Sequence, residues 1–263
     1  MFCLVCRIVW SCGTNIEKMV TRGYFRIFTD MQKKIQSVTI YHHLFLVGAF
    51  LWGGSLLNAQ TGQMVRDVDG NVYQTLTIDR QVWMGENLKT TRYNDGTPIP
   101  LVKEEIDWKG LSSPGYCWYN NDEGTFRRQY GVLYNWYAVN TKKLCPAGWH
   151  VPSDVEWGLL VTYFGGSYIA GAKLKETGTG DWASPNTGAT NESGFSALPG
   201  GYRDYSGTFK EQGYRGYWWT SYENTAKAWS RVMFNDNGYA SSQLAEEISG
   251  FSVRCMKDKT PPQ

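Results

Sequence analysis

Hydrophobic and polar positions near the start of the chain follow a different pattern from the rest. The basic residues Lys33 and Lys34 precede an apolar run of fourteen residues, Leu44 to Leu57, and small Ala59 comes just before polar sequence. This layout is typical of a secretory signal peptide, so residues 31–59 are predicted to be removed by cleavage after Ala59. Because the apolar run is shorter than the roughly 20 residues that cross a bilayer as a helix, we expect no membrane insertion after cleavage.

Residues 1–30 precede this complete signal peptide, where a functional segment would be hard to export. The simplest interpretation is an over-extended start, with translation beginning at Met31. The alternative is that Cys3 and Cys6 form a CxxC metal or redox motif, but no second pair of ligands accompanies them.

Beyond the signal peptide, apolar and polar residues alternate as they do in half-buried strands. Within 65–100, "DGN" and "NDG" interrupt the alternation, and Asn and Gly accept the positive φ that tight turns need. We therefore predict hairpins in this segment. Asp67, Asp69 and Asn71 also match the first positions of a calcium loop, but the terminal Glu and flanking helices of that motif are missing. Their absence favours a simple turn.

The best helix signal lies in the middle of the chain. Ser153 and Glu156 form a capping-box pattern that predicts a helix from about Asp154 to Phe164. Apolar residues recur at helical spacing, at Val155, Leu159, Leu160 and Tyr163. A second short helix is predicted over about Tyr168 to Glu176. The aromatic run at 130–140 fits either a short helix or a buried strand.

The segment 177–216 is rich in Gly, Asn, Ser and Thr, but it has apolar anchors of its own, Trp182, Phe195, Leu198 and Tyr202. Long loops are usually functional or disordered, and these anchors favour an ordered loop. Strand-like runs follow at 216–223, 228–239 and 250–256. The predicted fold is α+β, with short antiparallel strands, one or two helices and a long ordered loop region in a single domain over 60–258, before a tail at 259–263.

Composition and charge narrow the choice of partners. The whole chain has a net charge of +2, but six of its 26 basic residues and two of its 24 acidic residues precede residue 60, so the remainder carries −2. No basic patch therefore argues for nucleic acid or for an anionic membrane surface. The chain contains 12 Trp, 17 Tyr and 29 Gly, which predicts large rigid side chains joined by many loops.

Seven segments, in this order, resemble one known family: "DGNVYQTLTIDRQVWMGENLKTTRYNDGTPIP", "GYCWYNND", "YGVLYNWYAVN", "LCPAGWHVPSDVEW", "SPNTGATNESGFSALPGGYRD", "WWTS" and "GFSVRCMKD". Together they are similar to the Fibrobacter succinogenes major paralogous domain, an exported bacterial family common in Bacteroidetes and Fibrobacteres. The likeness covers nearly all of residues 65–258. That family in turn resembles the C-type lectin-like fold, especially its formylglycine-generating-enzyme branch, through "HVPSDVEW" before a helix and "GFSVRC" near the end.

The resemblance implies a compact α+β domain whose N- and C-terminal strands lie side by side and whose loop-rich half is displayed for binding. It supplies no reaction. The formylglycine-generating branch uses a pair of nearby cysteines late in its chain. Here Cys255 is the only late cysteine, so that oxidase chemistry is not expected.

Three cysteines remain after signal cleavage, and an exported protein is permitted a disulfide. We predict a disulfide between Cys145 and Cys255, closing a loop of about 110 residues, with Cys117 left as a buried free thiol. A pairing that uses Cys117 is the main alternative. No lipobox cysteine follows the apolar run, so a lipid anchor is not expected.

The sequence offers little support for a catalytic or metal site. His150 is the only histidine after residue 43 and lies in an apolar context, so a structural role is predicted. A nucleophilic site needs a histidine beside the nucleophile, and zinc usually needs three or four Cys or His ligands. Asp154 and Glu156 are explained by the helix start. The EPN, QPD and WND triplets of calcium-dependent lectins are absent. We expect no enzyme activity, cofactor or metal.

The remaining candidate is a binding surface of aromatic and polar loop residues. Alternation implies that one of Trp218 and Trp219 faces outward. The candidate ligand-binding residues are Tyr202, Arg203, Asp204, Tyr205, Trp218, Trp219, Tyr222, Glu223, Asn224, Asn235, Asp236 and Asn237. The expected function is recognition of a glycan or an envelope protein in the periplasm, at the outer surface or outside the cell. The alternatives are an enzyme of the formylglycine-generating or glycan-active class, and a structural surface component.

Overall fold

The computed structural model describes residues 60–259. The predicted signal peptide at 31–59 and the segment 1–30 lie outside the described residues, as does most of the tail at 259–263. Within the described chain, short helices alternate with antiparallel sheets. This is the predicted α+β class.

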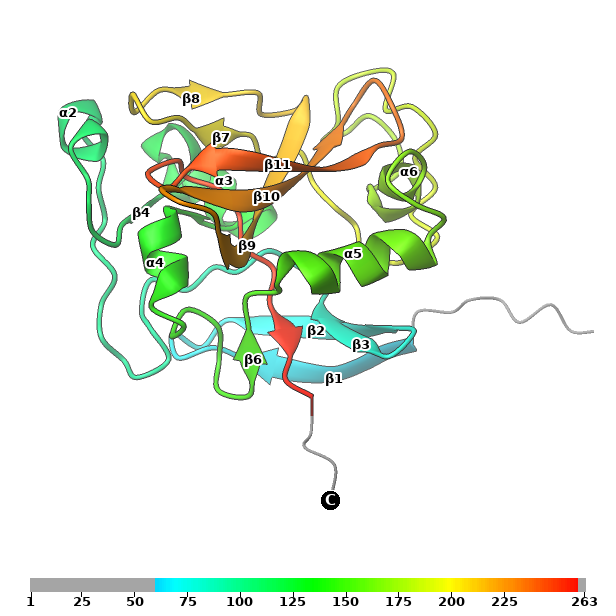
Figure 1. Cartoon of the computed structure of the whole chain (residues 1–263), viewed down its shortest axis with the longest axis horizontal. Coiled ribbons are helices and arrows are strands. Elements are labelled where there is room, and N and C mark those ends of the chain that lie inside the picture. Colours follow the sequence, from blue (N-terminus) through cyan, green and yellow to red (C-terminus); the bar gives the residue numbers. More distant parts are fainter. Residues whose placement is uncertain (1–59, 260–263) are drawn as a thin grey trace, which may run out of the picture. The chain divides into compact units, whose positions relative to one another are not determined.

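Segments from both ends of the domain meet in a five-stranded sheet of order β1-β2-β3-β12-β6 (Figure 1). β1 (Gln60–Arg66), β2 (Val72–Ile78) and β3 (Gln81–Met84) form a meander. β12 (Met256–Lys257) pairs antiparallel with β3 on one side and with β6 (Trp149–His150) on the other. The N-terminal meander and the C-terminal strand therefore lie side by side, as the resemblance implied.

The turn between β1 and β2 is the hairpin that "DGN" predicts. The Asp67 N–H donates to the Asn71 carbonyl at 3.0 Å, which closes the turn. Gly70 has a φ of +86°, a conformation that glycine adopts without a steric penalty because it has no Cβ. This hairpin places the Asn71 side chain at one end of the sheet.

A second sheet has three antiparallel strands in the order β11-β10-β9. Its strands are β9 (Arg215–Glu223), β10 (Lys227–Phe234) and β11 (Ala240–Glu246). Two short antiparallel pairs complete the strands, β4 (Tyr116–Cys117) with β5 (Leu133–Tyr134), and β7 (Tyr202–Arg203) with β8 (Phe209–Lys210). The predicted run at 216–223 lies in β9, whereas the run at 228–239 is strand only as far as Phe234, where β10 ends. Of the third predicted run, 250–256, only Met256 lies in a named strand, β12.

The capping-box helix is confirmed as α5 (Asp154–Tyr163). The Ser153 side chain accepts from the Glu156 N–H, and the Glu156 side chain accepts from the Ser153 N–H. α5 lies between the two larger sheets (Figure 1), with Trp157 and Leu160 packed in one cluster with residues of β2, β3 and β10. The second predicted helix is shorter than expected, α6 (Ala170–Leu174).

Three further α-helices precede α5, so the prediction of one or two helices was wrong. They are α2 (Glu105–Lys109), α3 (Glu123–Tyr130) and α4 (Trp136–Asn140), with a 3₁₀ turn η1 (Tyr119–Asn121) before α3. The ambiguous aromatic run is both strand and helix, because β5 leads directly into α4. Such five- to eight-residue helices carry too few periodic positions to be recognised from the pattern.

The strand β9 is buried on both faces, so the prediction that one of its two tryptophans faces outward was wrong. Trp218 and Trp219 are both 0 % exposed. Trp218 packs with Trp157 in the cluster around α5, while Trp219 packs against Phe251 at a ring distance of 4.3 Å in a second cluster. A core lies on each side of this strand. The alternating side chains of Trp218 and Trp219 therefore enter two different cores, and neither side chain reaches solvent.

The predicted disulfide between Cys145 and Cys255 is confirmed, and it spans 110 positions of sequence. It joins the segment before β6 to the start of β12. Cys117 is buried and forms no disulfide within the described part of the chain, which agrees with the predicted free thiol. Burial raises the pKa of the Cys117 thiol to about 12.

The long loop segment is packed through its own anchors, since Trp182 and Phe195 are fully buried. Buried Lys175, at the end of α6, ties this segment to the β10–β11 turn. Its Nζ donates hydrogen bonds to three carbonyl oxygens, those of Thr187 (3.2 Å), Phe234 (2.7 Å) and Asn237 (3.0 Å). These bonds satisfy all three ammonium protons.

Every helix within residues 60–259 is too short or too polar to cross a bilayer. In the same residues, no three His, Cys, Asp or Glu side chains are grouped as metal ligands would be.

Both ring nitrogens of His150 are hydrogen-bonded, but to carboxylates rather than in the predicted apolar context, so the protonation of His150 should make stability depend on pH. Its Nδ1 lies 2.6 Å from Asp258 Oδ1 and its Nε2 lies 3.2 Å from Glu156 Oε2. The hydrogen bond with Glu156 raises the pKa of His150 above its ordinary 6.5, burial opposes this rise, and Asp258 adds to it. The resulting stabilisation is complete below pH 6.5 and is lost as the pH rises through the folded-state pKa.

We therefore expect His150→Gln to remove about 0.5 kcal/mol at pH 5.5 and almost nothing at pH 8.5, a small effect because the pair is partly exposed. Urea unfolding of both proteins at the two pH values measures the difference. Parallel pH profiles for the variant and the parent protein would contradict this role.

Candidate functional site

A cavity of about 620 Å³ opens between the β1–β2 turn, the segment after β3, and the start of α3. Its lining residues are Asn71, Lys89, Glu123, Gly124, Arg127 and Arg128. Every one of them is charged, polar or glycine. The volume lies within the roughly 300–1,000 Å³ that small-molecule sites occupy, so the cavity can hold a ligand of a few rings.

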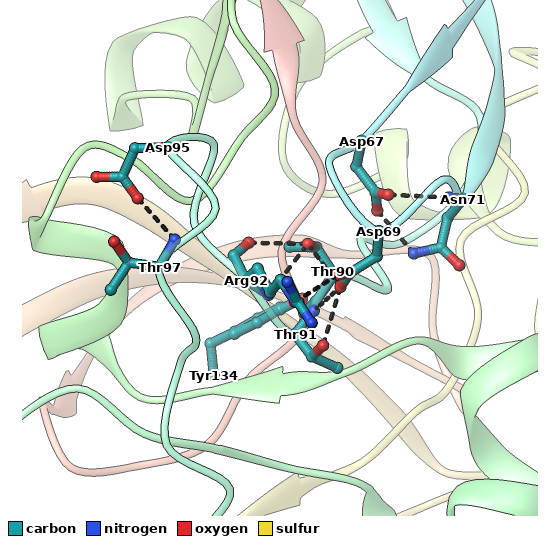
Figure 2. A network of polar contacts seen from close by, with 9 residues as sticks. All are labelled: Asp67, Asp69, Asn71, Thr90, Thr91, Arg92, Asp95, Thr97 and Tyr134. Carbon is teal, nitrogen blue, oxygen red and sulfur yellow. Dashed lines mark hydrogen bonds and ion pairs between the residues drawn. The ribbon is translucent and has the colours of Figure 1, made fainter.

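Asp67 fixes the first wall of the cavity. Its Oδ1 accepts from the Asn71 N–H at 2.9 Å, and its Oδ2 accepts from Asn71 Nδ2 at 2.8 Å and from the Tyr73 hydroxyl at 2.6 Å. Figure 2 shows the Asn71 amide nitrogen turned toward Asp67 and its oxygen turned away. That oxygen accepts no hydrogen bond from the described residues, so it is available to a ligand.

Asp69 fixes the second wall by holding the segment that follows Lys89 (Figure 2). Its Oδ2 accepts from the Thr91 N–H at 2.5 Å and from the hydroxyls of Thr91 and Thr90 at 2.9 and 3.1 Å. Burial would raise the pKa of Asp69, but these hydrogen bonds and the charge of Arg92 lower it below its usual range. Both aspartates therefore act as hydrogen-bond acceptors inside the protein, which supports the turn interpretation over the calcium loop.

Basic side chains dominate the cavity. Lys89 forms a short ion pair with Glu86, and Arg127 forms one with Glu123 at 2.8 Å. Arg128 is exposed and has no ion-pair partner among residues 60–259. The lining carries three positive charges and one negative charge, so an anion would be attracted to it.

Aromatic rings under the basic groups limit their movement. The Lys89 Nζ lies 5.7 Å from the centre of the Tyr73 ring, and the Arg127 guanidinium lies 5.7 Å from that of Trp118. Both rings are buried. The cations are thus held by rigid neighbours before any ligand binds.

The sequence-predicted surface residues do not converge on one site. Tyr205 is 61 % exposed in the β7–β8 turn, and Tyr222 is 58 % exposed near the β9–β10 turn together with Glu223 and Asn224. The residues Asn235–Asn237 lie in the β10–β11 turn. The β9–β10 and β10–β11 turns stand at opposite ends of β10, about 26 Å apart at the usual rise per residue.

Four of the predicted ligand contacts, Trp218, Trp219, Arg203 and Asp204, are buried, so their assignment to a binding surface was wrong. Arg203 is 1 % exposed and donates to three backbone carbonyls, those of Gly207, Val102 and Lys103, each at 2.8 Å. The Asp204 Oδ1 accepts from the N–H groups of Ser206 and Thr208. The side chains of Arg203 and Asp204 therefore hold the β7–β8 hairpin in place. Tyr202 is half-buried and packs against Tyr217 and Phe251.

Sequence reasoning missed Lys89, Arg127 and Arg128, and it considered Asn71 only as a turn or calcium residue. One local signal for the helix was present, because Asp122 caps α3 by accepting from the Thr125 N–H at 3.0 Å. An Asp followed by Glu is typical of a helix start. Recognising it would have placed Arg127 and Arg128 on a helix, but not beside Lys89.

Comparisons with known proteins identify a family but no named relative. Neither the curated proteins nor the solved structures include a significant match to the chain. The sequence profile of the Fibrobacter succinogenes major domain (Fib_succ_major) matches residues 76–257. This range includes Lys89 and α3, and it begins shortly after Asn71. Because the match covers well over half of the chain, the protein belongs to the Fibrobacter succinogenes major domain family.

Proposed function

We propose that the protein is an exported, non-enzymatic domain that binds a glycan at the cell envelope or cell surface. The observation that carries this proposal is the cavity between the β1–β2 turn and α3. Its hydrogen-bonding groups are fixed by Asp67, Asp69 and buried rings. A prearranged set of polar groups loses little entropy on binding, which suits a hydroxyl-rich ligand.

We further propose a C-type lectin-like fold. Its support is the neighbouring position of β3 and β12, the ordered long segment after α6, and the Cys145–Cys255 link. A disulfide also fits an oxidising compartment outside the cytoplasm.

Export predicts a defined mature N-terminus. Because cleavage is expected after Ala59, intact-mass spectrometry of the protein recovered from its native compartment should give a chain that begins at or near Gln60. A mature chain that retains residues 31–59 would contradict the signal peptide.

A glycan array with purified protein tests the binding function. We expect Asn71→Ala to weaken binding about tenfold, because the ligand loses a hydrogen-bond acceptor and the turn loses its bond to Asp67. Asn224→Ala, an exposed asparagine in the β9–β10 turn, is the matched control and should bind as the parent does. If Asn224→Ala weakens binding and Asn71→Ala does not, the binding site is at the β9–β10 turn. If no glycan on the array binds the protein, the proposed function is wrong.

One observation favours a glycan-active enzyme as the second candidate. Burial, together with the hydrogen bond to Asp181 and the charge of that residue, raises the pKa of Glu176 to about 7. Asp181 accepts from the Tyr130 hydroxyl at 2.8 Å and from Gln129 at 3.0 Å. Such a pair resembles the acid and base of a glycosidase, but glycosidase carboxyls stand at least about 5 Å apart to flank the scissile bond. The carboxyls of Glu176 and Asp181 are close enough to share a hydrogen bond, so we favour a binding function over glycosidase activity. Release of reducing ends from a polysaccharide, abolished by Glu176→Gln, would instead favour the enzyme.

A further inference from the structure

We propose that the cavity binds the anionic group, carboxylate or sulfate, of an acidic polysaccharide. This inference rests on the proposed glycan-binding function and names the chemistry of its ligand. It follows from three features of the cavity: its charge, the free donors of its arginines, and the absence of large apolar side chains from its lining.

The charge of the lining favours an anion. Lys89, Arg127 and Arg128 share the lining of the cavity with one acidic residue, Glu123. Lys89 forms an ion pair with Glu86, which does not line the cavity, and Arg127 forms one with Glu123. Arg128 is therefore left without an opposite charge from the described residues, and a ligand anion would supply it.

Arg127 has the donors and the fixed position that recognition of an anion needs. A guanidinium carries five N–H groups in a planar fork, and the Arg127 guanidinium uses its Nη1 for Glu123. Its remaining donors are free of bonds to the described residues. Since the ring of Trp118 and the Glu123 carboxylate hold this group, two parallel hydrogen bonds to a carboxylate or sulfate would cost little ordering.

The rest of the lining favours a sugar over a peptide. The Asn71 side-chain oxygen is an acceptor, so it matches a hydroxyl on the same ligand that carries the anion. No lining residue is apolar, whereas peptide-binding sites combine apolar pockets with a groove or a sheet edge. A sugar acid or a sulfated sugar presents both hydroxyls and an anion within a single ring.

Isothermal titration calorimetry of the purified protein tests the proposal with four probes. These are trigalacturonic acid, a sulfated chondroitin disaccharide, neutral galactotriose and tetraglutamate. We expect at least one acidic saccharide to bind at least about tenfold more tightly than galactotriose, and its affinity to fall as salt rises. The two acidic saccharides separate a carboxylate from a sulfate ligand.

Arg127→Gln and Arg128→Gln should each weaken binding of the acidic saccharide about tenfold, the usual loss for one charge-assisted hydrogen bond. Arg80→Gln, an exposed arginine in the turn between β2 and β3, is the matched control and should not change it. Thermal unfolding of each variant confirms that the fold is intact.

Failure of the anion site and failure of glycan binding would give different results. If galactotriose binds as tightly as the acidic probes, or if both arginine variants bind as the parent does, the anion site is wrong while glycan binding stands. If tetraglutamate binds more tightly than both acidic saccharides, the ligand is an acidic protein and the inference fails. If neither the array nor these saccharides show binding, the proposed function fails with it.

Discussion

Replacing Arg254 with methionine is expected to lower the free energy of unfolding by about 3–5 kcal/mol, which would be the largest effect of any single substitution considered for this domain. Arg254 is fully buried. Its Nη2 donates to Asn87 Oδ1 at 3.0 Å, and its Nη1 donates to the Phe195 carbonyl through a short bond. It also lies 4.0 Å above the centre of the Phe195 ring.

The size of this effect follows from what the substitution leaves behind. The Phe195 carbonyl would lose its donor in a dry interior, while Asn87 Oδ1 would keep the bond from Trp218 Nε1 at 2.8 Å. Because Arg254 links the last strand region, the segment after β3 and the long loop, all three would be loosened together. Urea unfolding measures the loss. Exposed Arg80→Met is the control, and a loss below 1 kcal/mol in Arg254→Met would contradict the structural role.

Removing the disulfide is expected to have the second large effect. The double variant Cys145→Ala/Cys255→Ala should lose about 4–5 kcal/mol, because an unfolded chain without the 110-residue loop constraint gains conformational entropy. Guanidinium unfolding of the variant and of the reduced parent protein should give similar losses. Cys117→Ala, which keeps the disulfide, is the control. Equal stability of the double variant and Cys117→Ala would contradict a stabilising link.

The sequence predicts those elements that are determined by residues close together along the chain. α5 was recognised because Ser153 and Glu156 satisfy the first N–H groups of the helix locally. The β1–β2 turn was recognised because Gly70 permits the positive φ that it needs. The disulfide pairing, in contrast, was predicted together with a family resemblance rather than from spacing alone.

Features that depend on how layers pack were not predictable in the same way. Trp218 and Trp219 alternate as expected for a strand, but a core lies on each face of β9. Arg203 looks like a surface residue in the sequence because the carbonyls that surround it, at Val102 and Lys103, lie a hundred positions earlier. An isolated stretch of sequence shows a side chain and not the neighbours that bury it.

The candidate site also depends on residues that are distant in sequence. Asn71, Lys89 and Arg127 come from three separate segments, and each is unremarkable within its own segment. The bond of Asp69 to Thr91 holds the β1–β2 turn beside the segment after β3, and the fold brings α3 to the same cavity. The predicted surface residues share only their residue type: some are buried in β7 and β9, and the exposed ones lie at three different turns.

The proposed ligand-binding site is the cavity between the β1–β2 turn and α3. An amide NMR titration of the purified, ¹⁵N-labelled protein with the tightest-binding acidic saccharide tests it most directly. We expect the largest chemical-shift changes on Asn71, Lys89 and the residues of α3 from Glu123 to Arg128. Changes concentrated on Tyr205, Tyr222 or Asn235–Asn237, with the cavity unaffected, would contradict it.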